Sequence, residues 1–264
     1  MLQLKNIHKT FNLGTINEKV ALDGVDLVLN EGDFVTVIGG NGAGKSTTLN
    51  AIAGVWPIDE GSILIDGIDV TGLPEHKRAK YLGRVFQDPM TGTTATMQID
   101  ENLALAARRG KPRWLGWGIT AEEKKEYKEL LKMLDLGLED RMTSKVGLLS
   151  GGQRQALTLL MATLQKPKVL LLDEHTAALD PKTAAKVLEL TDKIVAENNL
   201  TTIMITHNMK DAIAHGNRLI MMHEGKVILD IGPEEKKKLT VEDLLQKFED
   251  VSGEEFASDK ALLG

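Results

Sequence analysis

Short runs of β-favouring residues open the chain, and the third run differs from the first two. Residues 2–7 and 20–29 mix apolar and polar positions, whereas residues 34–38 are apolar almost without a break. A strand that is apolar on both faces is typical of the buried interior of a parallel sheet. The pattern therefore predicts two strands followed by a buried parallel strand.

The segments after this strand alternate between helix and strand signals. Residues 45–55 are expected to form a helix ending at Gly54, and residues 62–70 a hairpin that turns at Asp66 and Gly67. Further elements are expected at 168–173 (strand), 181–198 (helix), 201–207 (strand), 218–230 (hairpin, turning at Glu224 and Gly225) and 240–249 (amphipathic segment). This alternation predicts an α/β fold built on a parallel sheet.

The middle of the chain has a helical pattern. Residues 100–109 and 121–138 are both expected to be helices. In the second, four apolar residues recur at helical spacing: Tyr127, Leu130, Leu131 and Leu134. They define one buried stripe, so the charged run at 122–128 is the solvated face. Between the helices, a Gly/Pro loop carries Trp114 and Trp117, whose rings either cap a hydrophobic cluster, the simpler interpretation, or contact a partner.

Composition and charge narrow the class of protein. The chain has 264 residues, of which 42% are hydrophobic and 27% charged, enough for one large domain or two closely packed lobes. The net charge of −6 argues against nucleic acid as a partner, and the lack of cysteine excludes disulfides and thiolate chemistry. No segment has signal-peptide character or membrane-spanning length. We expect a soluble cytoplasmic protein that associates with a membrane only through a partner.

A glycine-rich loop follows the buried strand and precedes a helix. Its residues are Gly39, Gly40, Asn41, Gly42, Ala43, Gly44, Lys45, Ser46 and Thr47. They fit the pattern G-x-x-x-x-G-K-[ST], which occurs by chance in about one chain of this length in a hundred. In this context backbone N–H groups and the helix N-terminus can hold phosphate oxygens. Lys45 is expected to reach the β- and γ-phosphates, and the Ser46 hydroxyl to ligate Mg²⁺.

Two adjacent carboxylates, Asp173 and Glu174, end the apolar strand at 168–173. Ligands in open parallel sheets bind at the carboxyl ends of the strands, so these acids are expected to face the glycine loop. We expect Asp173 to hold the magnesium shell and Glu174 to accept a proton from an attacking water. The competing interpretation, a helix-capping acid, leaves the adjacent pair unexplained.

Two further polar residues follow strand signals. His207 ends the strand at 201–207, and the carboxyl end of this strand is expected to lie beside Glu174. It could contact the γ-phosphate and orient the water, whereas the other five histidines are interpreted as structural. The amide of Gln87, after a shorter strand, could ligate Mg²⁺ and hydrogen-bond the water. Alone, this glutamine is a weak signal.

Taken together, the motifs resemble one family. Phe11, the loop at 39–47, Gln87, "LSGGQ" at 149–153, "LLLDE" at 170–174, "ALD" at 178–180 and His207 follow the order and spacing of the nucleotide-binding subunit of ATP-binding cassette (ABC) transporters. The resemblance covers residues 1 to about 235. It implies ATP and Mg²⁺ as ligands and ATP hydrolysis as the activity. It also implies a P-loop NTPase fold with a mixed or parallel sheet core, an amino-terminal antiparallel β-subdomain and an inserted helical signature subdomain.

The resemblance also implies a dimer. In this family each ATP lies between the glycine loop of one subunit and the "LSGGQ" of the other. Phe11 then matches the aromatic residue that stacks on adenine, with an ordinary core phenylalanine as the alternative. The residues implied at the partner's nucleotide are Ser150, Gly151, Gly152 and Gln153, and Asp180 is also implied to bind nucleotide.

A single ABC ATPase domain spanning residues 1–264 is the expected organisation. The catalytic core with its β-subdomain is assigned to 1–88 and 166–233, the helical subdomain to 89–165, and a short helical tail to 234–264. The chain departs from the family pattern at His175, where proline is usual, at Gly40, and in the helix after the signature, which lacks the additional arginines. None of these departures removes a group that the chemistry needs.

Without a membrane segment of its own, such a subunit would work at the cytoplasmic face of the cell membrane, bound to separate permease subunits. The segment at 90–110 lies where family members dock the permease. Its composition resembles importer ATPases for amino acids and similar small solutes, with some similarity to a system for aromatic amino acids. An importer implies an extracytoplasmic solute-binding protein. Exporter ATPases, soluble cassette ATPases of the iron–sulfur assembly type and non-hydrolysing ATP switches remain as alternatives.

Overall fold

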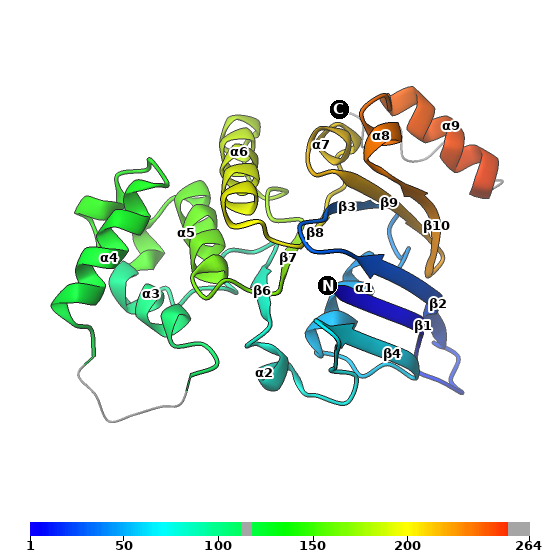
Figure 1. Ribbon diagram of the computed structural model, residues 1–264, viewed down its shortest axis with the longest axis horizontal. Helices are drawn as coiled ribbons and strands as arrows, with labels where there is room; N and C mark the ends of the chain where they lie inside the picture. Colours follow the sequence, from blue (N-terminus) through cyan, green and yellow to red (C-terminus); the bar gives the residue numbers. More distant parts are fainter. Residues whose placement is uncertain (112–117, 253–264) are drawn as a thin grey trace.

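The structure is a computed structural model that describes residues 1–111 and 118–252 (Figure 1). Trp114 and Trp117 lie outside the described residues, so the interpretation of their rings stays a prediction. The polypeptide forms two sheets on one side of the molecule and a group of helices on the other (Figure 1). Among the described residues, no helix is long and apolar enough to cross a membrane.

The larger sheet has six strands in the order β10-β9-β3-β8-β7-β6. Its strands are β3 (Phe34–Ile38), β6 (Leu82–Val85), β7 (Val169–Asp173), β8 (Thr202–Ile205), β9 (Arg218–His223) and β10 (Lys226–Ile231). All neighbouring pairs are parallel except β9 and β10, which form the expected hairpin. The predicted α/β fold with a buried parallel strand is confirmed, since every residue of β3 is buried.

Helices cover both faces of this sheet, and the alternation along β7 shows why. Val169 and Leu171 pack in the same cluster as Ile52 of α1 (Lys45–Ala53). Leu170 and Leu172 face the other way and pack with residues of α5 (Gly151–Thr163) and α6 (Pro181–Asn198). Successive side chains of a strand point to opposite faces, so an apolar strand requires a cover on each side.

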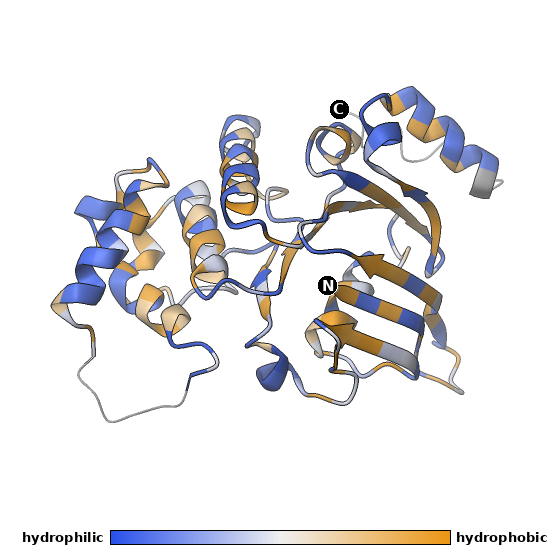
Figure 2. Ribbon diagram, in the orientation of Figure 1, coloured by the Kyte–Doolittle hydropathy of each residue, from blue (hydrophilic) through white to orange (hydrophobic). Residues whose placement is uncertain are grey.

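The smaller sheet is antiparallel and has the order β2-β1-β4-β5. Its strands are β1 (Leu2–Phe11), β2 (Lys19–Leu29), β4 (Glu60–Ile65) and β5 (Ile68–Asp69). Apolar residues of β1, β2 and β4 share one core with α1 and with the near face of the larger sheet. Figure 2 shows long hydrophobic stretches along the strands, whereas the short helix α2 (Glu75–Arg78) is almost entirely hydrophilic.

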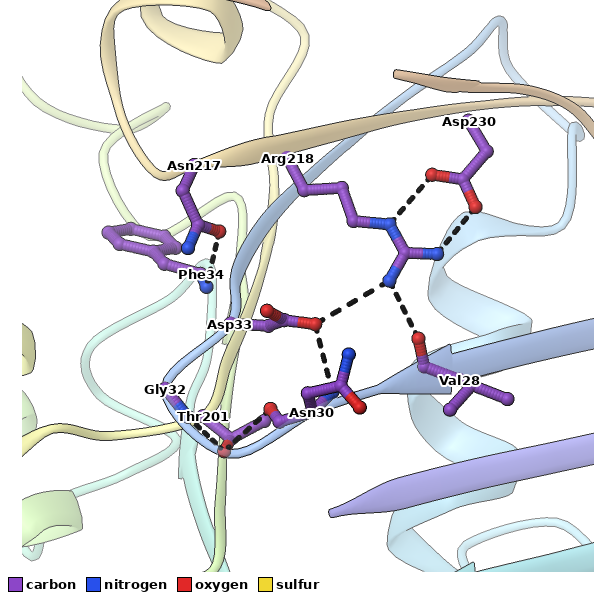
Figure 3. Close-up of polar contacts among 9 residues, drawn as sticks. All are labelled: Val28, Asn30, Gly32, Asp33, Phe34, Thr201, Asn217, Arg218 and Asp230. Carbon is purple, nitrogen blue, oxygen red and sulfur yellow. Dashed lines mark hydrogen bonds and ion pairs between the residues drawn. The ribbon is translucent and has the colours of Figure 1, made fainter. Parts of the chain in front are cut away.

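Arg218 joins the two sheets at the start of β9 (Figure 3). Its Nε donates to Asp230 Oδ1 of β10 at 2.7 Å, and its Nη1 donates to the backbone oxygen of Val28 in β2 at 2.7 Å. Nη1 also lies 3.5 Å from Asp33 Oδ2, just before β3. One guanidinium group thus fixes three strands of the two sheets relative to each other, because its donors form a rigid planar fork.

Arg78 performs a similar task at the end of α1. Its side chain is only 2% exposed and donates to four backbone oxygens, those of Ala51, Ile52, Thr71 and Leu73. The last carbonyl groups of a helix lack partners within the helix, and a cation there also complements the helix dipole. The helix that begins at the glycine loop is therefore held at its far end by a buried arginine.

The helical part contains α3 (Ile99–Ala107), α4 (Ala121–Lys132) and α5 around a separate apolar cluster. Tyr127, Leu131 and Leu134 are buried there, as the predicted stripe requires. The predicted helix at 121–138 is wrong at its end, since α4 stops at Lys132. The backbone turns because Asp135 adopts a left-handed conformation with φ of 52°. Two short turns of 3-10 helix follow at Leu138–Asp140 and Val146–Leu148.

The end of the described chain folds back onto the larger sheet. Helices α7 (Met209–Ala214), α8 (Pro233–Lys236) and α9 (Val241–Ser252) follow β8 and β10. Leu244 and Phe248 of α9 pack with Ile38 and Met221 of the sheet. The amphipathic segment predicted at 240–249 is therefore a packed helix.

Candidate nucleotide site

The glycine loop lies between β3 and α1, as predicted, and two of its glycines are required by close backbone approaches. Gly39 has φ of 147°, and a Cβ atom there would lie 2.1 Å from the backbone oxygen of Met222 in β9. Gly44 has φ of 100°, and its Cβ would lie 2.7 Å from the backbone oxygen of Ala21 in β2. Any other residue would clash with backbone atoms and adopt an unfavourable conformation. The loop is thus held between the two sheets.

Lys45, the first residue of α1, is 6% exposed, and its ammonium group lies within the curve of the loop. Nζ donates to the backbone oxygens of Gly39 at 2.7 Å and Gly40 at 3.1 Å. This cation, the N-terminus of α1 and the turned loop form an anion-binding arrangement.

A cavity of about 270 Å³ opens over the loop. It is lined by Phe11, Lys19, Ala21, Asn41, Gly42, Ala43, Gly44, Lys45, Ser46, Thr47 and Glu174. The Phe11 ring meets the Trp56 ring edge to face, with centroids 4.9 Å apart. Phe11 is therefore part of the cavity wall rather than an ordinary core residue, and its aromatic surface is available beside the loop.

The two predicted carboxylates lie at the carboxyl end of β7, facing the loop. The Ser46 hydroxyl donates to Asp173 Oδ1 at 3.4 Å. Burial raises the pKa of Asp173 above its usual range, and the nearby Arg84 opposes this rise. Glu174 has φ of 48°, a conformation that non-glycine residues seldom adopt and that often marks functional sites.

These residues fit a magnesium ion bound together with a triphosphate. A hydroxyl oxygen and a carboxylate oxygen are hard ligands, and Mg²⁺ usually takes one or two carboxylates plus phosphate oxygens and water. Among the described residues, no group of three or more His, Asp or Glu side chains could hold a metal by itself. Ser46 and Asp173 would thus hold the ion, which when bound would neutralise phosphate charge.

His207 and Glu174 meet at the tips of neighbouring strands. His207 Nε2 lies 2.6 Å from Glu174 Oε2, and the Glu174 carboxylate is only 11% exposed. This proximity follows from the parallel pairing of β7 with β8, which the sequence predicted. A carboxylate beside an imidazole can accept a proton while its orientation is fixed by the hydrogen bond.

Other predicted site residues lie apart from this cluster. Gln87 follows β6, is exposed and does not line the cavity. Ser150 caps α5, its Oγ accepting from the Gln153 N–H at 3.3 Å while Gln153 Oε1 accepts from the Ser150 N–H. Ser150, Gly152 and Gln153 line a different cavity, of about 480 Å³, beside α6. Asp180 caps α6 by accepting from the Thr183 N–H, and hydrogen bonding by the Thr183 side chain, together with that N–H, lowers the pKa of Asp180. Gly151 begins α5.

Two cationic residues near the site, Lys19 and Arg84, were not predicted from the sequence. Lys19 lines the cavity, and it is the first residue of β2, where the sequence pattern carries no phosphate-binding signal. Arg84 lies 3.8 Å from Asp173 and donates to Asn50 of α1 at 2.7 Å. The only sequence signal for Arg84 is a charged residue within a short apolar strand.

His175, which departs from the family pattern, is 2% exposed and pairs with Thr191 Oγ1 of α6 at 3.1 Å. Burial, together with the nearby His215, lowers the pKa of His175 to about 4. A neutral histidine here serves packing between the carboxylate segment and α6. These contacts agree with the prediction that His175 has a structural role.

Fold and site together define the class of protein. The glycine loop carries a buried lysine, lies between a parallel strand and a helix, and faces two carboxylates. This arrangement is the site of a P-loop nucleoside triphosphatase. A family model described as ABC transporter matches residues 22–177. The chain belongs to the ATP-binding cassette (ABC) transporter family, and it is an ATPase.

Individual relatives agree with this assignment. A tyrosine transport ATP-binding protein of Clostridioides difficile is 48% identical over 94% of this chain and 99% of its own length. A methionine import ATP-binding protein, MetN, of Corynebacterium diphtheriae is 37% identical over 86% of this chain. A spermidine/putrescine import ATP-binding protein, PotA, of Haemophilus influenzae is 34% identical over 89% of this chain. The chain spans 64% of the length of that MetN and 59% of that PotA.

A solved structure gives the same fold. A dimeric ATP-binding cassette, in a post-hydrolysis state bound to ADP and Pi, superimposes with a TM-score of 0.74 and is 32% identical. The match covers 88% of this chain and 98% of that one. The P-loop NTPase fold with a mixed sheet, an antiparallel sheet and inserted helices is thereby confirmed.

Proposed function

We propose that this protein is the ATP-hydrolysing subunit of a membrane importer whose solute is tyrosine or a closely related aromatic amino acid. The observation that carries the proposal is the 48% identity to a tyrosine transport ATP-binding protein along almost the whole chain. Import ATP-binding proteins for methionine and for polyamines are more distant, at 37% and 34% identity. The assignment as an importer therefore has support from more relatives than the assignment of the solute.

The residues of the site have the following proposed roles. Lys45 and the loop from Gly39 to Thr47 hold the phosphates, and Phe11 stacks on the adenine. Ser46 and Asp173 hold Mg²⁺, with Gln87 approaching once nucleotide is bound. Glu174 takes the proton of the attacking water, and His207 keeps the Glu174 carboxylate and that water in line. The contact between His207 and Glu174 supports this pairing of roles.

We further propose that two copies of the chain close over two ATP molecules. Ser150, Gly152 and Gln153 lie in a cavity separate from the one over the glycine loop. Within one chain the two phosphate-binding motifs therefore do not share a site, and a second copy would bring Ser150 to Gln153 to the nucleotide. The dimeric form of a related cassette supports this arrangement. Asp180 then lies at the same interface.

The separate hydrophobic clusters support a proposed division of the chain into subdomains. Residues 1–88 and 166–233 would act as the catalytic core with its antiparallel sheet, and residues 89–165 as a helical subdomain that moves the signature. A distinct apolar cluster around Ile99, Leu131 and Leu157 supports a separate helical unit. Residues 234–264 are assigned to the carboxyl-terminal tail, of which the structure describes 234–252. The segment 90–110 would dock a permease at the cytoplasmic face of the membrane, with a solute-binding protein outside.

Uptake measurements test the solute and the direction together. A strain lacking this gene is expected to lose tyrosine uptake, and the wild-type gene to restore it while Glu174→Gln does not. Uptake of methionine and spermidine in the same strain serves as the matched control. Undiminished tyrosine uptake would refute the solute. Loss of methionine or spermidine uptake instead would reassign the solute, and secretion defects without uptake defects would favour an exporter.

A mixing experiment tests the dimer. Ser150→Arg and Lys45→Ala are each made in the Glu174→Gln background, so that ATP is trapped rather than hydrolysed. Each variant alone is expected to trap no ATP. In equal mixtures about half of the dimers are mixed, and each mixed dimer has one intact composite site, so about a quarter of all sites should trap ATP. Cross-linked mixed dimers that trap none would contradict the proposal.

A further inference from the structure

The magnesium carboxylate has a cationic neighbour that the proposed mechanism does not use. Arg84 lies on β6, the edge strand of the six-stranded sheet, and pairs in register with Leu171 of β7. Alternate residues of a strand point to the same face, so Arg84 and Asp173 lie on the face covered by α1. The sheet register therefore brings the guanidinium group beside the carboxylate.

Three contacts hold the guanidinium group in place. Its Nη2 donates to Asn50 Oδ1 of α1 at 2.7 Å and lies 3.8 Å from Asp173 Oδ2. Its centre lies 4.5 Å from the centroid of the Phe86 ring. The short bond goes to Asn50 and the longer contact to Asp173, so the arginine does not depend on the carboxylate for its position. It would stay there when a metal ion approaches.

The two oxygens of Asp173 face different partners. Oδ1 meets the Ser46 hydroxyl, where the metal is expected, and Oδ2 meets Arg84. Both side chains are largely shielded from water, at 14% exposed for Arg84 and 16% for Asp173. Charges that are shielded in this way interact more strongly than charges at the surface. A cation bound at Oδ1 therefore experiences repulsion from Arg84 across the carboxylate.

The balance of charge at the site supports the same conclusion. Asp173 and Glu174 are the two carboxylates at the end of β7, and Lys45 and Arg84 are two cations next to them. Removing the charge of Arg84 would leave the carboxylates in excess, which favours a divalent cation. A triphosphate brings several negative charges, and these would offset the repulsion when metal and nucleotide bind together.

We propose that Arg84 is the resident counter-cation of Asp173 and weakens the binding of free Mg²⁺ to the nucleotide-free site, so that the metal enters together with a nucleoside triphosphate. This inference rests on the proposed role of Asp173 as the magnesium carboxylate. Arg84 acts through Asp173 and is thus a positioning residue of the ATPase.

Metal binding without nucleotide provides the test. Mn²⁺ serves as the probe, its free concentration is followed by electron paramagnetic resonance, and Mg²⁺ is added as the competitor. Arg84→Met, which removes the charge, is expected to bind Mn²⁺ at least tenfold more tightly than the wild-type protein. Arg84→Lys keeps the charge and is expected to remain within threefold of wild type. Arg84→Gln, which keeps a donor for Asn50, gives a second neutral variant should Arg84→Met fold poorly.

Two controls locate the effect. Arg109→Met removes a half-buried arginine of the helical part, which donates to the Ala162 backbone oxygen, and is expected to leave Mn²⁺ binding unchanged. Asp173→Asn combined with Arg84→Met is expected to abolish the gain. Unchanged or weaker Mn²⁺ binding by both neutral variants overturns the inference, as does a gain that survives Asp173→Asn. If Asp173→Asn alone leaves the Mg²⁺ dependence of ATP binding intact, the proposed role of Asp173 fails instead.

Discussion

Replacing Arg78 by methionine tests how far the nucleotide site depends on a residue outside it. The guanidinium group donates to the backbone oxygens of Ala51, Ile52, Thr71 and Leu73 at 2.7 to 2.9 Å. Methionine fills much of the same volume but donates to none of them. The change therefore removes hydrogen bonds and a cation at the end of α1, with little loss of packing.

The size of the effect follows from the number of oxygens left without a donor. All four oxygens lose the donor from Arg78, but Ala51 keeps the Gly54 N–H at 3.2 Å, so three oxygens are left without a donor. A buried group that loses its partner costs about 1 kcal/mol or more, which gives a loss of roughly 3 kcal/mol in the free energy of unfolding. For a chain of this size each kcal/mol shifts the melting temperature by about 2–4 °C, so we expect a decrease of roughly 6–12 °C.

Thermal unfolding followed by circular dichroism measures this decrease, with urea unfolding as a second method. Arg141→Met, at an exposed arginine, is the matched control and is expected to shift the melting temperature by less than about 2 °C. Arg78→Lys keeps a charge but reaches fewer oxygens, so its loss should be intermediate. If Arg78→Met melts within about 2 °C of wild type, the buried arginine does not stabilise α1 as argued.

Three further predictions address the catalytic carboxylate, the phosphate-binding lysine and the pH dependence of stability. Glu174→Gln should bind Mg-ATP but lower turnover by about 10²–10⁴, since an amide cannot accept the proton; unchanged turnover would place the general base elsewhere. Lys45→Ala should lose most of its affinity for a fluorescent ATP analogue, because the triphosphate loses its main cation; near-normal affinity in a folded variant would contradict the assignment. The lowered pKa of His175, about 4, means that the unfolded chain takes up the proton first as the pH falls from about 6.5. The contribution of His175 to the free energy of unfolding is thus complete above about pH 6.5 and declines by on the order of 3 kcal/mol towards pH 4. His175→Gln should remove this part of the decline, which urea unfolding at pH 7.5 and 4.5 measures.

Much of the site was predictable because its motifs are short and contiguous in the sequence. The glycine loop and the carboxylates are each contiguous in sequence, and each follows a strand whose apolar run is unmistakable. The contact between His207 and Glu174 was also predictable, since adjacent parallel strands end at one edge of the sheet. The helix at 121–138 was predicted too long, because Leu134 is buried although α4 has already ended at Lys132, so the apolar spacing continues past the helix end.

Only the tertiary structure decided the contacts that long side chains make between different elements of the chain. Arg84 reaches Asp173, Arg78 reaches the end of α1, and Arg218 of β9 reaches β2 and β10. Sequence periodicity reports which face of an element is apolar, but it does not contain the order of strands, which sets the neighbours of each arginine. The same order and packing place Ser150 in a different cavity from Lys45. The sequence by itself determines the nucleotide chemistry, and the packing of the chain determines which charges surround it.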